Sequence, residues 1–400
     1  MIVALLVSTG ATWEADALRV MNDHPGVVVL KRCVDVDDLL ATASAGQAQV
    51  AVLAAELAGL DAGVVDDLRQ HGVRVVAVAA DADATLVRAE RIGIDTVLAA
   101  DRVAEVADAV TRAPDGPSAG ADPTLSGSPS VPPPEPPTAA RGRVIAVWGP
   151  AGAPGRTTLA AGLAAELARR RLTTVLLDAD PYGGSVAQQL GILDEVSGLL
   201  SAARLAAGGQ LDDRFATAQR RLTDHLRVVT GLPRPDRWPE VRPGTLARVI
   251  DRARAEAQVV VDTGFSVEPD LMGDPGVARP ERNSLTREAL EAADDALVVG
   301  SADPVGLARL ARAVSDLREL TEAPVPRLVV NRMRPTLGWR EADVVAMLAG
   351  FGPNAGVHFL PDDQPAVDKA LVAGRTLLES GESPLTRAVA ALVDALAARR

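Results

Sequence analysis

Cysteine, histidine, aromatic residues and lysine are all scarce in this chain of 400 residues. The single cysteine, Cys33, excludes an intramolecular disulfide framework and a zinc site built from cysteines. The four histidines are scattered, so they do not form the closely spaced ligand pattern of a histidine metal centre. Aromatic residues make up 2% and apolar residues 48%, so the cores must consist of alanine, valine and leucine. This composition favours helices on parallel sheets over a sandwich or barrel.

Long apolar runs are absent too, since none approaches the roughly 18 residues that a membrane-spanning helix needs. The opening MIVALLVSTG has neither a basic leader nor a cleavage site, so we expect a first strand there. The net charge is −12, and residues 1–112 contribute most of it, with 9 Lys and Arg against 17 Asp and Glu. This acidity argues against a nucleic acid as the partner of that region. We expect a soluble cytoplasmic protein.

Proline is concentrated in one place. Nine of the 28 prolines lie between Pro114 and Pro137, within a stretch that also contains many glycine and serine residues. Such a segment cannot bury enough apolar surface to fold and favours extended, solvated conformations. We therefore expect three parts, namely an N-terminal domain over 1–112, a linker over 113–141 and a C-terminal domain over 142–400.

The N-terminal part alternates short apolar runs with helical patterns, which indicates an α/β doubly wound parallel sheet. The expected strands are 2–8, 27–34, 50–55, 74–79 and 95–99, with a last helix at 102–112. This order resembles a response-regulator receiver domain. That resemblance implies an acidic pair, a phosphorylated aspartate, a hydroxyl and a lysine after successive strands. The chain instead has Ser8-Thr9-Gly10, Ala54-Ala55, Ala79-Ala80 and Ala100-Asp101. A pseudo-receiver used for docking is favoured over a phosphoryl acceptor.

The C-terminal part opens with a buried strand pattern at 143–148 and an amphipathic helix at 157–170. The connecting loop reads GPAGAPGRTT, from 149 to 158. A glycine-containing turn between strand and helix directs backbone N–H groups at one point, and the helix N-terminus adds partial positive charge. This pattern predicts a phosphate-binding loop. The expected nucleotide-binding residues are Gly152, Gly155, Arg156, Thr157 and Thr158, with the Thr157 hydroxyl on Mg²⁺ and Arg156 against the β- and γ-phosphates.

The loop departs from the usual phosphate-loop pattern at two positions. Pro150 occupies the place of the first glycine, and Arg156 replaces the lysine. The whole chain has only two lysines against 39 arginines, so a general bias accounts for part of this exchange. A planar guanidinium is nevertheless not equivalent to a compact ammonium at a tight site. We expect nucleotide binding to survive more readily than rapid hydrolysis, and a plain glycine-rich turn remains the alternative.

Aspartates follow two more predicted strands. Residues 173–178 form a strand pattern that ends in Asp178, with Asp180 two residues later, and residues 259–262 end in Asp262. Carboxylates at the carboxyl ends of strands beside a phosphate loop can orient an attacking water or the shell of Mg²⁺. Asp180 and Asp178 are therefore the predicted catalytic residues, and Thr157 and Asp262 the predicted metal-binding residues. Helix caps or turn formers are the alternative for each aspartate.

These motifs together resemble the MinD/ParA family of deviant-Walker ATPases, over roughly residues 142–400. The resemblance includes LVVNRM at 328–333 and the segment beginning VHFLPDD at 357–363. It implies a mainly parallel sheet, ATP and Mg²⁺ as ligands, Asn331 reading the adenine edge, and Pro361 and Asp362 lining the base. With a pseudo-receiver and a proline-rich linker in front, the architecture resembles the CpaE/TadZ branch, which includes actinobacterial septum-site-determining proteins and positions Flp pilus machinery.

One departure from the family concerns its partner contacts. The signature lysine of the family, which reaches the partner's phosphates in a homodimer, corresponds to Ala151 here. The resemblance implies an ATP-dependent positioning protein of division or pilus machinery, recruited to the septum or cell pole. Two alternatives remain, a docking scaffold that does not hydrolyse ATP and a ParA-like DNA partitioner. DNA is the less expected partner, because it requires a basic surface on residues 142–400, whose charge is close to balance.

Three further segments have alternative interpretations. The segment 385–399 is amphipathic, and MinD relatives bind membranes through such a tail, but its few basic residues favour a helix packed on the domain. The polar excursion at 263–290 is either a mobile loop over the site or an exposed insert, with the insert favoured. The segment 231–244 is an interaction loop or an ordered surface loop, with the latter favoured.

Overall fold

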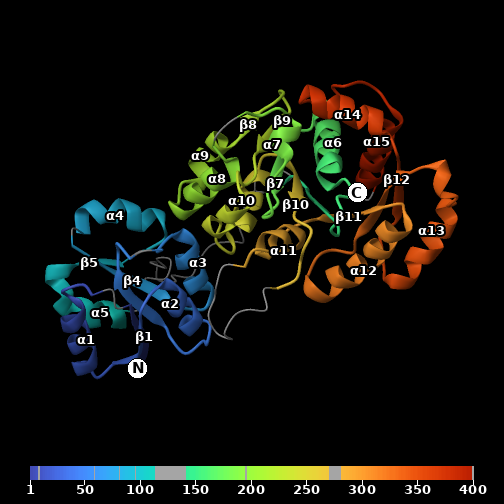
Figure 1. The fold of residues 1–400 in the computed structure, drawn as a ribbon. Helices are drawn as coiled ribbons and strands as arrows, with labels where there is room; N and C mark the ends of the chain where they lie inside the picture. Colours follow the sequence, from blue (N-terminus) through green and yellow to red (C-terminus); the bar gives the residue numbers. More distant parts are fainter. Residues whose placement is uncertain are drawn as a thin grey trace, which may run out of the picture. The chain divides into compact units, whose positions relative to one another are not determined.

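The computed structural model describes residues 1–7, 10–57, 59–80, 82–94, 96–112, 141–193, 196–269 and 281–398. The described chain divides into two compact units (Figure 1), one formed by residues 1–112 and the other by most of the residues from 141 onward. Nearly all of the expected linker and the centre of the 263–290 excursion lie outside the described residues.

The N-terminal unit is a five-stranded parallel sheet with strand order β2-β1-β3-β4-β5. This is a doubly wound order with helices on both faces, as the alternating pattern predicted. Helices α1 and α5 contact each other, and α2 packs beside α3. Its strands are β1 (Ile2–Val7), β2 (Val27–Cys33), β3 (Val50–Ala54), β4 (Arg74–Ala79) and β5 (Thr96–Ala99), and its helices are α1 (Glu14–Asp23), α2 (Val36–Ala43), α3 (Ala62–Gln70), α4 (Ala82–Arg91) and α5 (Val106–Thr111), with a 3₁₀ turn at Ala100–Glu105.

The carboxyl ends of these strands are apolar where a receiver needs polar groups. Ala54 ends β3 and Ala79 ends β4, and both are buried. An alanine side chain can neither accept a phosphoryl group nor form a hydrogen bond with a phosphoryl group bound elsewhere. The Ser8 and Thr9 positions lie outside the described residues. The described ends of β3 and β4 therefore lack the aspartate and the hydroxyl that a receiver has there, and the docking role stays a prediction.

The C-terminal unit contains an eight-stranded sheet with strand order β13-β12-β11-β6-β10-β7-β9-β8. Every pairing is parallel except that of β8 with β9. The glycine-rich loop that was predicted to bind phosphate follows the central β6. The strands β10 and β7, which carry Asp262 and Asp178, come next in the sheet. The strands are β6 (Val144–Trp148), β7 (Thr174–Ala179), β8 (Arg220–Arg221), β9 (Leu226–Val229), β10 (Gln258–Thr263), β11 (Asp295–Ser301), β12 (Arg327–Met333) and β13 (Val357–Pro361).

Helices cover both faces of this sheet (Figure 1). Along β6, Ile145 and Val147 face the cluster that contains α6 and α15, whereas Ala146 and Trp148 face the cluster that contains α12. This alternation explains why the strand is a continuous apolar run. The helices are α6 (Arg156–Arg169), α7 (Val186–Gln189), α8 (Gly198–Ala207), α9 (Leu211–Arg214), α10 (Thr245–Arg254), α11 (Ser284–Glu291), α12 (Pro304–Leu320), α13 (Glu341–Leu348), α14 (Gln364–Ala373) and α15 (Pro384–Ala397).

The last helix, α15, is packed on the domain. The five apolar residues of its predicted stripe are all buried in the cluster shared with α6, namely Leu385, Val389, Leu392, Val393 and Leu396. The packed helix is therefore confirmed, and the alternative of a membrane-binding tail is wrong for this helix because its apolar face is already covered. Across the described residues, no helix combines the length and apolarity that crossing a membrane requires.

The proline- and arginine-rich segment 231–244 is ordered and includes a 3₁₀ turn at Pro235–Glu240. The guanidinium of Arg282 lies 5.8 Å from the centroid of the Trp238 ring and 5.1 Å from that of Tyr182. Cation–π contacts of this kind stabilise a surface loop. Of the two interpretations, this geometry supports the ordered surface loop.

Candidate functional site

The glycine-rich loop joins the end of β6 to the start of α6. Gly155 has a φ of 99°, in the left-handed region that favours glycine, and α6 begins at the next residue. A β-carbon on Gly149 would lie 2.2 Å from the carbonyl oxygen of Val299, so only glycine fits there. The first N–H groups of α6 have no partner within the helix and carry partial positive charge. The loop therefore has the geometry of an anion-binding helix N-terminus.

The side chain of Arg156 lies across the base of this loop. Its Nη1 donates to the carbonyl oxygens of Gly149 and Pro150, each at 3.1 Å, and its Nε donates to the carbonyl oxygen of Thr263 at 3.3 Å. The guanidinium thus connects the end of β6 with the end of β10. These bonds use the N–H groups of Nε and Nη1, and Nη2 has no hydrogen bond to the described residues. The two N–H groups of Nη2 are therefore the donors that Arg156 could direct at a phosphate.

Asp178 is enclosed by backbone. Its carboxylate accepts hydrogen bonds from the N–H groups of Val186 at 3.0 Å and Asp180 at 3.3 Å. β-Carbons on Gly184 and Gly231 would lie 2.3 Å and 2.6 Å from this carboxyl group, so two glycines close around it. Burial raises the pKa of Asp178 to about 7. This geometry supports a role for Asp178 in shaping the loop after β7 rather than in contacting a substrate.

Asp180 is more accessible and is held by its own loop. It accepts a hydrogen bond from the N–H of Tyr182 at 2.8 Å, and the Tyr182 hydroxyl donates to Oδ1 of Asn283 at 2.8 Å. The Tyr182 ring also packs on Phe265, with ring centroids 4.4 Å apart. Burial raises the pKa of Asp180, whereas the Arg156 guanidinium opposes that rise. Asp180 is therefore a partly exposed carboxylate in a fixed position beside the phosphate loop.

Asp262 has the features of a cation ligand. In the parallel pairing of β10 with β7 it stands opposite Asp178, and its side chain is 1% exposed. Its Oδ1 has no hydrogen-bond partner among the described residues, and its carboxyl group is hydrogen-bonded with the Thr157 side chain. Burial and the neighbouring Asp178 carboxylate raise the pKa of Asp262. A buried, unsatisfied acceptor next to a hydroxyl is costly on its own and fits a hard cation such as Mg²⁺.

The protein alone does not complete a metal site here. Within the described residues, no three His, Cys, Asp or Glu side chains converge as metal ligands. Mg²⁺ usually takes one or two protein carboxylates and completes its shell with water and substrate phosphates. Asp262 and Thr157 therefore fit a metal that arrives together with a phosphorylated ligand.

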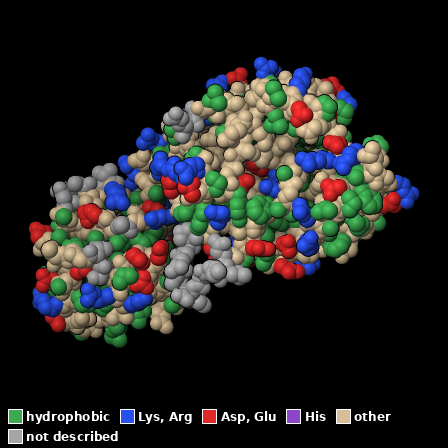
Figure 2. Space-filling view, in the orientation of Figure 1, with side chains coloured by type: hydrophobic (Ala, Val, Ile, Leu, Met, Phe, Trp, Pro, Cys, Tyr) green, Lys and Arg blue, Asp and Glu red, His purple; other side chains and the backbone are tan. Residues whose placement is uncertain are grey.

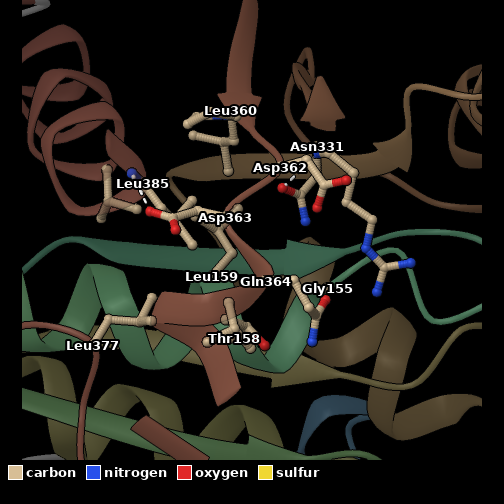
Figure 3. A pocket seen from close by; sticks show the side chains of 14 residues that line it. Gly155, Thr158, Leu159, Asn331, Leu360, Asp362, Asp363, Gln364, Leu377 and Leu385 are labelled. Atoms are coloured by element: carbon tan, nitrogen blue, oxygen red, sulfur yellow. Dashed lines mark hydrogen bonds between the residues drawn. The ribbon is translucent and has the colours of Figure 1, made fainter. Parts of the chain in front are cut away.

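A second set of predicted residues lines a pocket beside the loop (Figure 3). Asn331 from β12 and Asp362, which follows β13, lie at one side, and Thr158 of α6 lies across the pocket from them. Pro361 and Gly155 also line it. Apolar side chains complete the wall, namely Leu159, Leu360, Leu377, Leu385 and Val389. This combination of an apolar wall with a few polar groups is typical of a site for a flat heterocycle.

The pocket is narrow because Asn331 bridges it to the loop. The Asn331 Nδ2 donates to the carbonyl oxygen of Pro154 at 2.8 Å, and its Oδ1 accepts from the N–H of Arg332 at 2.8 Å. The cavity measures about 50 Å³, enough for a few water molecules. A purine therefore requires the Asn331 side chain to leave Pro154, after which its amide offers both a donor and an acceptor.

Replacing Asn331 by alanine should reduce base selectivity. We expect affinity for Mg-ATP to fall roughly 10-fold, while affinity for Mg-GTP changes little, because the lost amide matches the adenine edge. Competition binding against a fluorescent ATP analogue measures both. Gln364→Ala is the matched control, since this other pocket amide already bonds Asp368 at 2.6 Å. An unchanged ATP-to-GTP ratio in Asn331→Ala would contradict the assigned role.

The structure thus brings the predicted residues together in two adjoining groups. The phosphate loop, Arg156 and Thr157 lie with Asp180 and Asp262 at the carboxyl ends of β6, β7 and β10. Sequence reasoning missed two contributions. The first turns of α15 help to form the pocket wall, and Arg309 of α12 donates to the carbonyl oxygen of Ala151 at 3.2 Å. Neither had a local sequence signal, because both come from segments distant in the chain.

Comparisons with known proteins agree with this geometry. Residues 145–372 match the family described as the CobQ/CobB/MinD/ParA nucleotide binding domain. The cell division ATPase MinD of Pyrococcus furiosus is 18% identical, with a TM-score of 0.52, over 65% of this chain and 100% of that one. A ParA family ATPase from Chlorobium tepidum is 18% identical, with a TM-score of 0.52, over 64% of this chain and 98% of that one. The comparison with curated proteins gave no match. The two structures share the fold of the C-terminal unit, and the family match covers more than half of the chain, which therefore belongs to the CobQ/CobB/MinD/ParA nucleotide-binding family.

Proposed function

We propose that this protein is an ATP- and Mg²⁺-binding switch that positions protein partners of the division or pilus machinery. The observation that supports it best is the convergence of the glycine-rich loop, Arg156, Thr157 and Asp262 at the carboxyl ends of adjacent parallel strands. Ligands of open α/β sheets bind at that edge. The N-terminal unit supplies a docking surface in this proposal.

Each residue of the site has an assigned role. The loop amides and Arg156 hold the phosphates, Thr157 and Asp262 hold the metal, and Asp180 orients the attacking water. Asn331 and Asp362 bind the base against the apolar wall of the pocket. Mg²⁺, when bound, neutralises charge that develops on the phosphates. Asp178 acts indirectly, through the two N–H groups that it anchors.

Hydrolysis is slow in this proposal. Three of the five N–H donors of Arg156 are held by carbonyl oxygens, and its wide guanidinium replaces a compact ammonium. Ala151 provides no cation toward a second subunit, so ATP adds little to a homodimer. The same contacts support the second candidate, a docking scaffold that does not hydrolyse ATP. A DNA partner is not proposed, because residues 142–400 have no excess of Lys and Arg over Asp and Glu.

We favour cell division as the process, because one similar structure is that of a cell division ATPase. Pilus assembly is the alternative. A fluorescent fusion in dividing cells tests the positioning role. The wild-type fusion should form foci at the septum or pole, and an Arg156→Ala fusion at equal abundance should be diffuse. Diffuse signal from both would contradict a positioning protein, whereas identical foci from both would favour the scaffold.

A further inference from the structure

A small polar cavity lies beside the first half of the phosphate loop, between the loop and the start of α12. It measures about 90 Å³ and is lined by Ala151, Gly152, Asp303, Arg309 and Arg332, among others. The cavity adjoins the loop that receives phosphates in the proposed function, but none of the residues assigned above explains its two arginines.

The side chain of Arg309 contacts the glycine-rich loop directly. Its Nη1 donates to the carbonyl oxygen of Ala151 at 3.2 Å, and the rest of this exposed side chain makes no hydrogen bond to the residues that the structure describes. A β-carbon on Gly152, where φ is 110°, would lie 2.3 Å from that nitrogen. The guanidinium therefore approaches the loop this closely because residue 152 is glycine.

The side chains that line the cavity carry more positive than negative charge, and the positive groups are available to contact a ligand. Its one carboxylate, Asp303, caps α12 by accepting from the N–H of Gly306 at 2.9 Å, and this bond holds the pKa of Asp303 below its usual range. Among the residues that the structure describes, neither Arg309 nor Arg332 forms an ion pair. Two guanidinium groups without a carboxylate partner among these residues lie beside backbone N–H groups in this cavity. Such an arrangement can bind a phosphate, because a planar guanidinium donates two parallel hydrogen bonds to two phosphate oxygens.

The order of residues along the site indicates which phosphate this is. The base pocket is lined by Gly155 and Thr158, and the metal-binding Thr157 lies between them in sequence. Gly152 is three residues before Gly155, at the end of the loop away from the helix. A triphosphate that extends from the base pocket along the loop thus brings its terminal group nearest to Gly152.

On this basis, we propose that Arg309 binds the terminal phosphate of ATP, and that it distinguishes ATP from ADP. In this proposal the guanidinium of Arg309 leaves the Ala151 carbonyl oxygen and donates to the γ-phosphate. The chain that binds the nucleotide thus supplies a second cation beside Arg156. This inference rests on the proposed function, because it presupposes that the loop binds a nucleoside triphosphate.

Calorimetric titration of the full-length chain tests it, with a non-hydrolysable Mg-ATP analogue and with Mg-ADP. Arg309→Ala should weaken analogue binding on the order of 10- to 100-fold and leave ADP binding within about 2-fold. Arg309→Lys should recover part of the loss, since it keeps the charge without the fork. Arg318→Ala removes an exposed arginine from the far end of the same helix and should match wild type for both nucleotides.

Failure of this inference is distinguishable from failure of the proposed function. If wild type binds neither nucleotide, the proposed function is wrong and the inference falls with it. If wild type binds both and Arg309→Ala is indistinguishable from it, only the inference is wrong. Equal losses for the analogue and ADP would also overturn it, because Arg309 would then merely brace the loop through Ala151.

Discussion

Replacing Arg156 by alanine is expected to weaken Mg-ATP binding roughly 10- to 100-fold. The change removes the cation nearest the phosphates, and a charge-assisted hydrogen bond contributes roughly 1.5–3 kcal/mol. It also removes the bonds by which the guanidinium holds the carbonyl oxygens of Gly149, Pro150 and Thr263. The loop therefore loses both its charge and its anchor to β10. Equilibrium binding of a fluorescent ATP analogue measures the effect.

Two variants separate a local effect from a general one. Arg156→Lys keeps a positive charge in the form usual for such loops, so it should bind Mg-ATP at least as well as wild type. Arg169→Ala removes another arginine of α6, one that pairs with Glu166 at 2.7 Å, and should leave binding unchanged. Wild-type affinity in Arg156→Ala would show that the loop does not use this side chain.

Replacing Asp180 by alanine is the second large expected effect. We expect turnover to fall to background, a loss of about 100-fold or more, with Mg-ATP affinity changed only a few-fold, because Asp180 acts on water rather than on the nucleotide. Phosphate release under single-turnover conditions measures it. Asp180→Asn is the matched variant, since its amide oxygen can still accept the Tyr182 N–H that orders this loop.

The outcomes for Asp180 separate the two candidate functions. Turnover that is lost in both Asp180 variants supports the slow switch. Turnover that persists unchanged in both would contradict the assigned role. A wild-type chain that binds ATP without any turnover would instead be the docking scaffold.

The strands and the principal loop could be predicted from the sequence because they depend on local patterns. The expected strand at 143–148 is observed at 144–148, and the expected helix at 157–170 is observed at 156–169. Parallel strands that are buried on both faces are continuous apolar runs in the sequence, so the change to polar residues marks where each strand ends. The short β9, at 226–229, gave no comparable signal. The mainly parallel α/β fold was confirmed, but the strand order needed three-dimensional structure.

The site was predictable only in part, for a physical reason. Side chains that follow parallel strands gather at one edge of the sheet, so the grouping of the loop with Asp180 and Asp262 followed from topology. Which of these groups are reachable depends on packing. The glycines that enclose Asp178 lie at 184 and 231, and the side chain that presses on Gly152 lies at 309. No local pattern encodes such contacts, which is why Asp178 could not be told from Asp180.

The most direct test of the nucleotide site is a calorimetric titration of ATP into the full-length chain, with excess Mg²⁺ and again with a chelator. The loop, Asp262 and the base pocket together predict saturable binding at one site per chain with Mg²⁺, and clearly weaker binding without it. A cooperative thermal unfolding transition establishes that the titrated protein is folded. No binding heat from folded protein with millimolar Mg-ATP would contradict the account, and binding indifferent to Mg²⁺ would contradict the role of Asp262 and Thr157.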